Sequence, residues 1–304
     1  MKLPGPLLLI AVFSAALSLS PVTEAQRSPN PDFLDGARSY TYRSVDGVTL
    51  RLHVYSPRES GSASRPAIVF FFGGGWMQGS VRQFVHQANY LANRGMVAII
   101  ADYRVLLRHG ATVADAVSDA KAAISWVRGS AQTLGIDPDR IVAAGGSAGG
   151  HLAAATATVS LGELEDWQGD VRSRMLDPLA RPTFSSRPNA LVLFNPAVNT
   201  GKVGGSRPLQ FPGDARELSP FHQVSDASVP TLILHGTADT TVPYLDVVAY
   251  CDKVDSLGGD CRLTGYERAM HGFFNKGLEN DRWFTATLQE TDDFLTELGY
   301  LPAK

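Results

Sequence analysis

The chain has 304 residues, of which 44% are hydrophobic, and a formal net charge of −3. This length and apolar content suffice for one large domain with a sizeable core. The mild acidity gives no reason to expect nucleic acid or an anionic membrane surface as a partner.

The first residues are predicted to be a targeting segment. Lys2 precedes an apolar stretch from Leu7 to Leu19, and Thr23-Glu24-Ala25 offers small residues at the cleavage-determining positions. Because the apolar stretch is too short to span a bilayer comfortably, we favour a signal peptide at residues 1–25 over a signal anchor. No cysteine follows it, so no lipid anchor is indicated. Residues 26–304 then form the mature domain, secreted or periplasmic.

The mature chain begins with a predicted β-hairpin and continues as alternating strands and helices. The hairpin has an Asp46-Gly47 turn between strands at 41–45 and 48–55. Further strands, mostly continuous apolar runs typical of burial on both faces, are predicted at 67–72, 97–101, 141–144, 191–194, 231–234 and 261–266. Helices are predicted at 83–94, 113–128, 151–155, 244–257 and 283–298. This order favours an α/β fold with a mostly parallel central sheet, helices on both faces and antiparallel strands at the start.

Three connecting segments are also interpreted. Asp137-Pro138 predicts a turn before the strand at 141–144. The stretches 161–188 and 197–228 are rich in charge, glycine and proline, and both lie between strands. We expect them to form loops or short helices of a partial cap over the site, with surface decoration as the alternative.

Two cysteines, Cys251 and Cys261, are the only ones in the chain. In an exported protein they can pair, so we predict a disulfide in preference to two buried free thiols. No basic partner stands beside either residue in the sequence, so neither is a candidate nucleophile.

The most informative motif is Gly145-Gly146-Ser147-Ala148-Gly149. It follows an apolar strand and precedes a helix of small residues, which is the context of a G-x-S-x-G nucleophile elbow. Glycines let the backbone turn sharply there, so that the Ser147 hydroxyl is exposed at the C-terminal edge of the sheet. Ser147 is therefore the candidate nucleophile.

A serine hydroxyl needs a base within hydrogen-bond reach, and the base needs a third group that holds its tautomer. In this fold the chain order is serine, acid, histidine. Asp239 and His271 each follow a predicted strand, so both should reach the edge where Ser147 lies. Asp246 is the alternative acid, but it falls inside a predicted helix. His151, one turn after Ser147, is interpreted as structural.

The oxyanion of a tetrahedral intermediate needs preorganised N–H donors. A glycine-rich loop follows the buried strand at 67–72, and we assign the amides of Gly74 and Gly75 as donors. The amide of Ala148, at the start of the helix after the nucleophile, is the third. A phosphate-binding loop is the poorer interpretation, because no Walker lysine follows.

These motifs resemble the α/β-hydrolase superfamily, and most of all its hormone-sensitive-lipase-like esterases and small secreted carbohydrate esterases of the acetyl or feruloyl type. The resemblance covers roughly residues 40–300 and rests on five motifs: Phe72-Gly73-Gly74-Gly75-Trp76, Asp102-Tyr103-Arg104, Gly145 to His151, His235 to Asp239, and His271-Gly272-Phe273. It implies that Asp102-Tyr103-Arg104 braces the oxyanion loop.

The chain departs from the family pattern at two positions. Phe72 stands where the oxyanion loop usually begins with histidine, so we expect apolar packing to hold the loop instead. Gly146 stands where lipase-like relatives often have aspartate, which tilts the interpretation toward carbohydrate esterases.

The sequence therefore predicts a secreted serine carboxylesterase that acts on a small-molecule or oligosaccharide ester and uses no metal or organic cofactor. Trp76 beside the oxyanion loop is expected to bind substrate and narrow the acyl pocket, which favours a short acyl group such as acetyl. One alternative is a serine peptidase of the prolyl-oligopeptidase type, although the chain lacks the large gating domain of those enzymes. The other is a non-catalytic binding module, although such proteins typically lose a triad residue.

Overall fold

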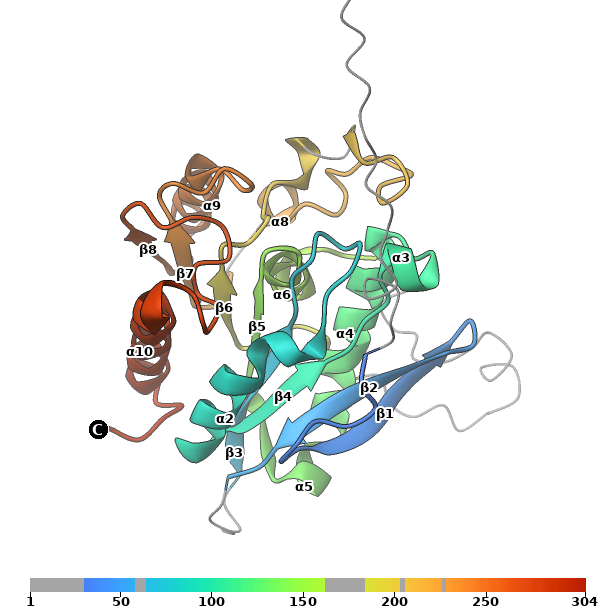
Figure 1. Ribbon diagram of the computed structural model, residues 1–304, viewed down its shortest axis with the longest axis vertical. Helices are drawn as coiled ribbons and strands as arrows, with labels where there is room; N and C mark the ends of the chain where they lie inside the picture. The colour runs from blue at the N-terminus through green and yellow to red at the C-terminus, as the bar shows by residue number, and fades with distance from the viewer. Residues whose placement is uncertain (1–29, 58–63, 162–183, 203–205, 226–227) are drawn as a thin grey trace, which may run out of the picture.

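The computed structural model describes residues 30–57, 64–161, 184–202, 206–225 and 228–304 (Figure 1). The predicted signal peptide and most of the first candidate cap stretch lie outside the described residues. Within them, eight strands form one sheet in the order β1-β2-β4-β3-β5-β6-β7-β8. The strands are β1 (Arg38–Val45), β2 (Val48–Tyr55), β3 (Arg65–Phe71), β4 (Val97–Ala101), β5 (Ile136–Gly146), β6 (Ala190–Phe194), β7 (Thr231–Gly236) and β8 (Cys261–Tyr266).

The sheet is mostly parallel, as the sequence predicts. β1 pairs antiparallel with β2, and β2 pairs antiparallel with β4. All later pairs, from β4 and β3 to β7 and β8, are parallel. The C-terminal ends of the parallel strands therefore meet at one edge, where loops from distant parts of the chain converge.

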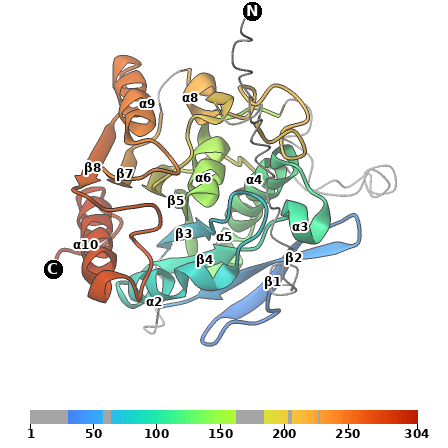
Figure 2. The ribbon, with the colours of Figure 1, turned by 45° about the horizontal axis from the view of Figure 1, so that its top comes forward.

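Helices cover both faces of the sheet (Figure 2). The helical segments are η1 (Val81–Phe84), α2 (Val85–Asn93), α3 (Leu106–His109), α4 (Val113–Gly129), α5 (Ala131–Leu134), α6 (Ala148–Thr158), η3 (Thr200–Lys202), α8 (Pro220–Gln223), α9 (Tyr244–Ser256), η5 (Glu279–Asp281) and α10 (Arg282–Glu297). α2 and α10 lie together on one face, where Arg94 Nε donates to Asp292 Oδ2 at 2.6 Å. α4, α6 and α9 lie on the other face. No helix in the described ranges is long and apolar enough to cross a bilayer.

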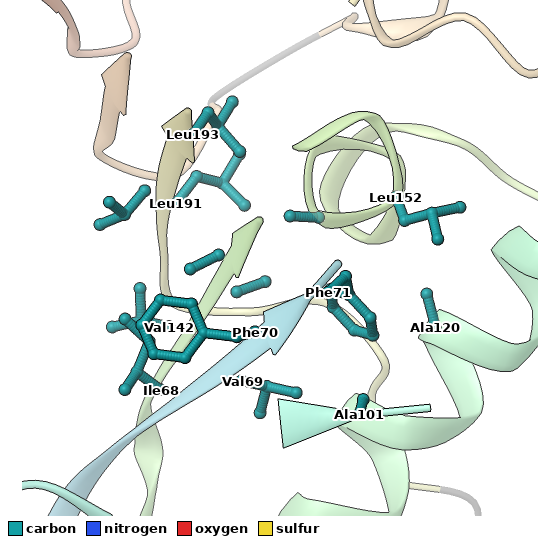
Figure 3. Packing of buried hydrophobic residues seen from close by; sticks show 14 of the residues in the cluster. Ile68, Val69, Phe70, Phe71, Ala101, Ala120, Val142, Leu152, Leu191 and Leu193 are labelled. Carbon is teal, nitrogen blue, oxygen red and sulfur yellow. The ribbon is translucent and has the colours of Figure 1, made fainter. Parts of the chain in front are cut away.

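The core is centred on β3, whose side chains alternate between the two faces (Figure 3). Phe70 stacks on Phe84 with ring centroids 4.9 Å apart, on the α2 side. Phe71 points the other way, toward Leu152 of α6 and Ala120 of α4. All five side chains are fully buried, and burying one phenylalanine contributes about 1.5–3 kcal/mol. This double-sided burial fixes the end of β3, from which the next loop starts.

One predicted turn is wrong. Asp137-Pro138 lies inside β5. Arg65 and Ala67 of β3 are two positions apart, yet they pair with Ile136 and Ile141, which are five positions apart. The intervening residues bulge out of the ladder, which tolerates proline because no ladder hydrogen bond is needed there. The Asp137 carboxylate closes the bulge by accepting from the amide of Asp139 at 3.0 Å and from the Arg140 side chain at 2.7 Å.

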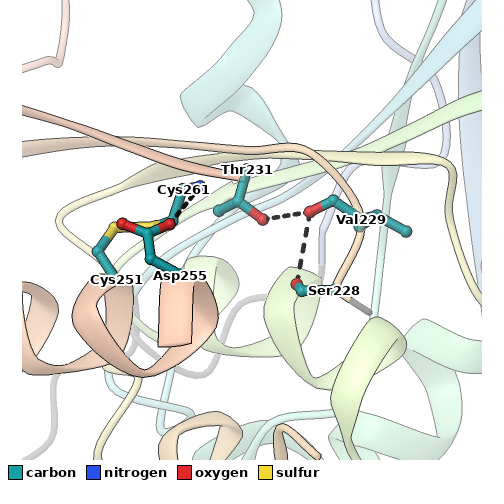
Figure 4. Close-up of a disulfide and its surroundings, with 6 residues drawn as sticks. All are labelled: Ser228, Val229, Thr231, Cys251, Asp255 and Cys261. Atoms are coloured by element: carbon teal, nitrogen blue, oxygen red, sulfur yellow. Dashed lines mark hydrogen bonds between the residues drawn. A yellow bond between two sulfur atoms is a disulfide. The ribbon is translucent and has the colours of Figure 1, made fainter. Parts of the chain in front are cut away.

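The predicted disulfide is present (Figure 4). It joins Cys251 on α9 to Cys261 at the first position of β8, ten residues apart in sequence. The Cys261 amide also donates to Asp255 Oδ1 at 3.2 Å. The bridge therefore ties the helix that follows Asp239 to the strand that leads to His271.

Replacing both cysteines by serine should lower the free energy of unfolding by about 2–3 kcal/mol, because the bridge restricts the unfolded chain over a short loop. Urea unfolding of both proteins measures the difference. Reductant should destabilise the wild type by a similar amount and leave the variant unchanged. Equal stability of wild type and variant would contradict this account.

Candidate active site

Ser147 occupies a strained backbone position between β5 and α6. Its φ is +55° and its ψ is −118°, a region that non-glycine residues rarely adopt. The surrounding chain holds it there, since its amide donates to the Phe194 carbonyl at 2.9 Å and its carbonyl accepts from the amides of His151 and Ala197 at 2.9 and 3.2 Å. Such over-determined strain is typical of a functional turn.

Two glycines beside Ser147 allow close approaches that a side chain would block. A Cβ on Gly149 would lie 2.0 Å from the Phe71 carbonyl oxygen, so glycine lets α6 pack against the end of β3. A Cβ on Gly146 would lie 2.5 Å from Phe274 Cζ. The Phe274 ring thus occupies the space that an aspartate at position 146 would need, which gives the second departure from the family pattern a steric cause.

The structure brings Ser147, His271 and Asp239 together in one hydrogen-bonded line. His271 Nε2 lies 2.9 Å from Ser147 Oγ, and His271 Nδ1 lies 2.7 Å from Asp239 Oδ2. An ionised carboxylate only accepts hydrogen bonds, so Nδ1 carries the proton toward Asp239 and Nε2 accepts from the serine hydroxyl. The side chain of Asp239 is fully buried, whereas that of His271 is 24% exposed.

The surroundings of Asp239 favour its ionised form. Burial alone would raise the pKa of its carboxyl, but hydrogen bonds from His235, His271 and Val242 lower that pKa well below its ordinary value. Oδ1 accepts from the amides of Thr241 and Val242 at 2.8 and 2.9 Å. The alternative acid, Asp246, lies in α9 and pairs with Lys202 instead.

In the loop after β3, the carbonyls of Gly74 and Gly75 accept hydrogen bonds within the protein, whereas the amides of these two residues do not donate any to the described residues. The carbonyls of Gly74 and Gly75 accept from Met77 N at 3.1 Å and from the Gln210 side chain, respectively. In the part of the chain that the structure describes, the amides of Gly74, Gly75 and Ala148 have no protein acceptor. These three amides are therefore free to donate to a substrate oxygen.

The expectation that apolar packing alone replaces the usual histidine is wrong in part. Phe72 does stack on Tyr103, with ring centroids 4.1 Å apart. Hydrogen bonds also hold the loop, since Tyr103 Oη donates to the Phe72 carbonyl at 2.6 Å and Arg108 Nη1 donates to the Gly79 carbonyl at 2.7 Å. Within the Asp102-Tyr103-Arg104 motif, Tyr103 braces the loop directly, whereas Arg104 bonds to the buried Asp119.

Trp76 lies in a buried aromatic cluster and is only 4% exposed. Its Nε1 donates to His151 Nδ1 at 3.2 Å, and its ring meets Phe211 edge to face. His151 Nε2 in turn donates to the Leu218 carbonyl at 2.7 Å, and burial lowers the pKa of His151 to about 4. His151 is thus neutral and structural, and it links α6 to the described part of the 197–228 stretch, which lies beyond the strand ends (Figure 1).

The sequence did not predict three amide side chains around the site. Asn195, directly after β6, accepts from the Gly272 amide at 3.0 Å. Gln83 and Asn275 bond to the oxyanion loop and to the loop after His271. Asn195 carries the same strand-end signal that identified Asp239, but Gln83 has no such signal because it lies in η1. Among the described residues, no cluster of three His, Cys, Asp or Glu side chains forms a metal-binding group.

Comparison with known proteins agrees with this geometry. The profile of the BD-FAE family matches residues 52–177, and that of the prolyl oligopeptidase family matches residues 205–296. Esterase 2 of Thermogutta terrifontis, in a structure phosphoramylated by tabun, is 44% identical with a TM-score of 0.80, over 89% of this chain and 97% of that one. The chain therefore belongs to the α/β-hydrolase family of carboxylic ester hydrolases.

Two further structures of the same relative contain small carboxylates, and a curated relative is more distant in sequence. The propionate-bound and butyrate-bound structures of the same Thermogutta esterase are 42% and 41% identical, each with a TM-score of 0.80. A probable isoprenylcysteine alpha-carbonyl methylesterase, ICMEL1 of Oryza sativa subsp. japonica, is 27% identical over 73% of this chain and 54% of the relative. The chain spans about half the length of the curated relatives it matches at this level.

Replacing Asp239 by asparagine should reduce the free energy of unfolding by roughly 1.5–3 kcal/mol at pH 7, because hydrogen bonds to a charged group are lost. Since the folded-state pKa of Asp239 is lowered, its contribution is complete above the ordinary value of about 3.9 and fades as pH falls below it. Unfolding measured between pH 7 and pH 3 should therefore show the two proteins converging. A gap that stays constant with pH would contradict the assignment. Ser147→Ala is the control, because it keeps Asp239 and its stability gap to the wild type should stay constant over this pH range.

Proposed function

We propose that the protein is a serine carboxylesterase that cleaves short-chain acyl esters, acetyl esters above all, with Ser147, His271 and Asp239 as its catalytic residues. The observation that carries the proposal is the line of hydrogen bonds from Ser147 Oγ through His271 to Asp239. It places a base on the hydroxyl of the half-buried, strained Ser147 and a carboxylate behind the base, which is the arrangement of a serine hydrolase.

The proposed reaction has two halves. Ser147 Oγ attacks the ester carbonyl carbon while His271 Nε2 takes the hydroxyl proton, and Asp239 stabilises the imidazolium that forms. The amides of Gly74, Gly75 and Ala148 donate to the oxyanion. Collapse of the intermediate breaks the bond to the alcohol, which takes the proton from His271. Water then attacks the acyl-enzyme in the same way and releases the carboxylic acid.

Two observations support a short acyl group. Trp76, the residue after Gly75, packs edge to face against Phe211 in a buried cluster, so large aromatic side chains stand next to the oxyanion loop. The Thermogutta terrifontis esterase, which shares the fold over nearly its full length, binds propionate and butyrate. Both are small carboxylates of the kind that an acyl-enzyme would release.

We further propose that the alcohol half of the natural ester is a carbohydrate. A cavity of about 740 Å³, large enough for a small ligand, lies beside Gly74. The side chains of Arg82, His86 and Lys276 contribute polar or charged groups to its lining, and such groups can bond the hydroxyls of a sugar. The match to the BD-FAE family supports the same direction.

We also propose that the protein is secreted or periplasmic. The apolar stretch before Ala25 supports export. The Cys251–Cys261 bridge supports it as well, because disulfides persist mainly in oxidising compartments.

A peptidase of the prolyl-oligopeptidase type is the second candidate, since that family's profile matches residues 205–296. The matched part contains Asp239 and His271, which both classes of enzyme use in the same way. The BD-FAE match covers the loop of Gly74 and Gly75 together with Ser147, and it favours ester substrates.

Ser147→Ala should lower kcat for p-nitrophenyl acetate by at least about 10⁴-fold while the fold is retained, because among the described residues no other hydroxyl is paired to His271. Stopped assays and circular dichroism of both proteins measure this. Turnover of the variant within tenfold of the wild type would dismiss Ser147 as the nucleophile.

The wild type should hydrolyse p-nitrophenyl acetate and butyrate with kcat/KM at least about tenfold above the octanoate, because the aromatic side chain of Trp76 next to Gly75 is expected to narrow the acyl pocket. A panel of p-nitrophenyl esters, with a prolyl p-nitroanilide peptide alongside, measures the preference. Equal rates on octanoate would contradict the short-acyl proposal, and faster cleavage of the peptide than of any ester would favour the peptidase.

A further inference from the structure

Two separate loops supply two of the three proposed oxyanion donors and the proposed base. The first follows β3 and carries Gly74 and Gly75, and the second follows β8 and carries His271. Each must keep its place relative to Ser147, yet they come from strands that lie on opposite sides of β5 in the sheet. The sheet fixes the strand ends, but it does not fix the loops beyond them.

A pair of side-chain amides joins the two loops directly. Gln83 Oε1 accepts from the Gly73 amide at 2.7 Å, and Gln83 Nε2 donates to Asn275 Oδ1 at 3.0 Å. Asn275 Nδ2 then donates to the Gly272 carbonyl at 2.8 Å. The bridge therefore runs from the residue before Gly74 to the residue after His271, through two residues that are 192 positions apart in sequence.

Every heavy polar atom of the two amides has a partner in this bridge. The donor and acceptor directions are fixed, since the Gly73 amide can only donate and the Gly272 carbonyl can only accept. Gly272 is also held from its other side, because its amide donates to the buried Asn195 at 3.0 Å. Asn275 and Asn195 thus fix both backbone polar groups of the residue next to His271.

We propose that Gln83 and Asn275 are positioning residues that couple the oxyanion loop to the base loop. This inference rests on the proposed ester hydrolysis. Neither side chain touches the reacting atoms. Their bridge holds the Gly74 and Gly75 amides and His271 Nε2 at one mutual spacing around Ser147 Oγ. Oxyanion donors and a general base act on the same tetrahedral intermediate, so a shift of either loop by about 1 Å costs on the order of 10²-fold in rate.

The test uses Gln83→Leu, Asn275→Leu and the double variant in the full chain. Each single variant should lower kcat for p-nitrophenyl acetate by roughly 10- to 100-fold with KM changed less than about threefold, because the amides orient groups that act in the transition state. The double variant should be no slower than the slower single variant, since both break one bridge. Single variants within twofold of wild-type kcat, or losses that multiply in the double variant, would overturn the proposal.

Two matched controls remove an amide of the same kind elsewhere. Asn89 Nδ2 donates to the Val85 carbonyl within α2, and Gln289 Nε2 donates to Asp293 within α10. Both are exposed and bridge nothing between loops. Asn89→Leu and Gln289→Leu should keep wild-type kcat. If they lose as much as the bridge variants, the loss reflects general destabilisation and the proposal is wrong.

Hydrogen exchange gives a readout that does not depend on turnover. Gln83→Leu should speed amide exchange in residues 270–277, and Asn275→Leu should speed it in residues 72–79, each by at least about threefold. Exchange that changes only in the loop next to the substitution would contradict the coupling. If the wild type proved not to be an esterase, reciprocal exchange would still report the bridge, so failure of the proposed function and failure of this inference are distinguishable.

Discussion

The site depends on one constraint, the strained backbone of Ser147 at the end of β5. Residues other than glycine rarely adopt a φ of +55°, so the surrounding packing must hold this conformation. The amide and carbonyl of Ser147 are both bonded to neighbouring chain, and Gly149 lets α6 approach the end of β3 closely. The core of β3 and β5, buried on both faces of the sheet, is the rigid support for this turn. Without that support, the Ser147 hydroxyl would not be held at the edge of the sheet.

The groups around Ser147 come from three other loops, and hydrogen bonds rather than the sheet set their final positions. Asp239 is fixed by two backbone amides, and His271 is fixed by Asp239 and by the bonds to Gly272. The loop of Gly74 and Gly75 is fixed through its carbonyls, which leaves its amides open. An electrostatically prepared site needs this pattern, because donors that are already aligned need not reorganise during the reaction.

The sequence predicted the fold well, because β3, β4, β6 and β7 are short apolar runs and the order of strands and helices along the chain matches the α/β pattern. It also placed Ser147, Asp239 and His271 on loops that converge, because strand ends of a parallel sheet meet at one edge. It failed at Asp137-Pro138, where a turn signal marks a bulge within a strand that continues. It also missed Gln83, Asn195 and Asn275, because the role of an amide depends on what lies opposite it in space. For the same reason it did not show that the Trp76 ring packs against His151 and Phe211 in a buried cluster.

The central claim is that Ser147 is the group that becomes acylated, and covalent labelling tests it most directly. The protein would be treated with paraoxon, which phosphorylates the related Thermogutta terrifontis esterase, digested with trypsin and analysed by mass spectrometry. The account predicts one diethylphosphoryl group, on Ser147 in the peptide of residues 141–172, with loss of esterase activity in proportion to labelling. Loss of activity with the label on another residue, or full activity in protein labelled at Ser147, would contradict it.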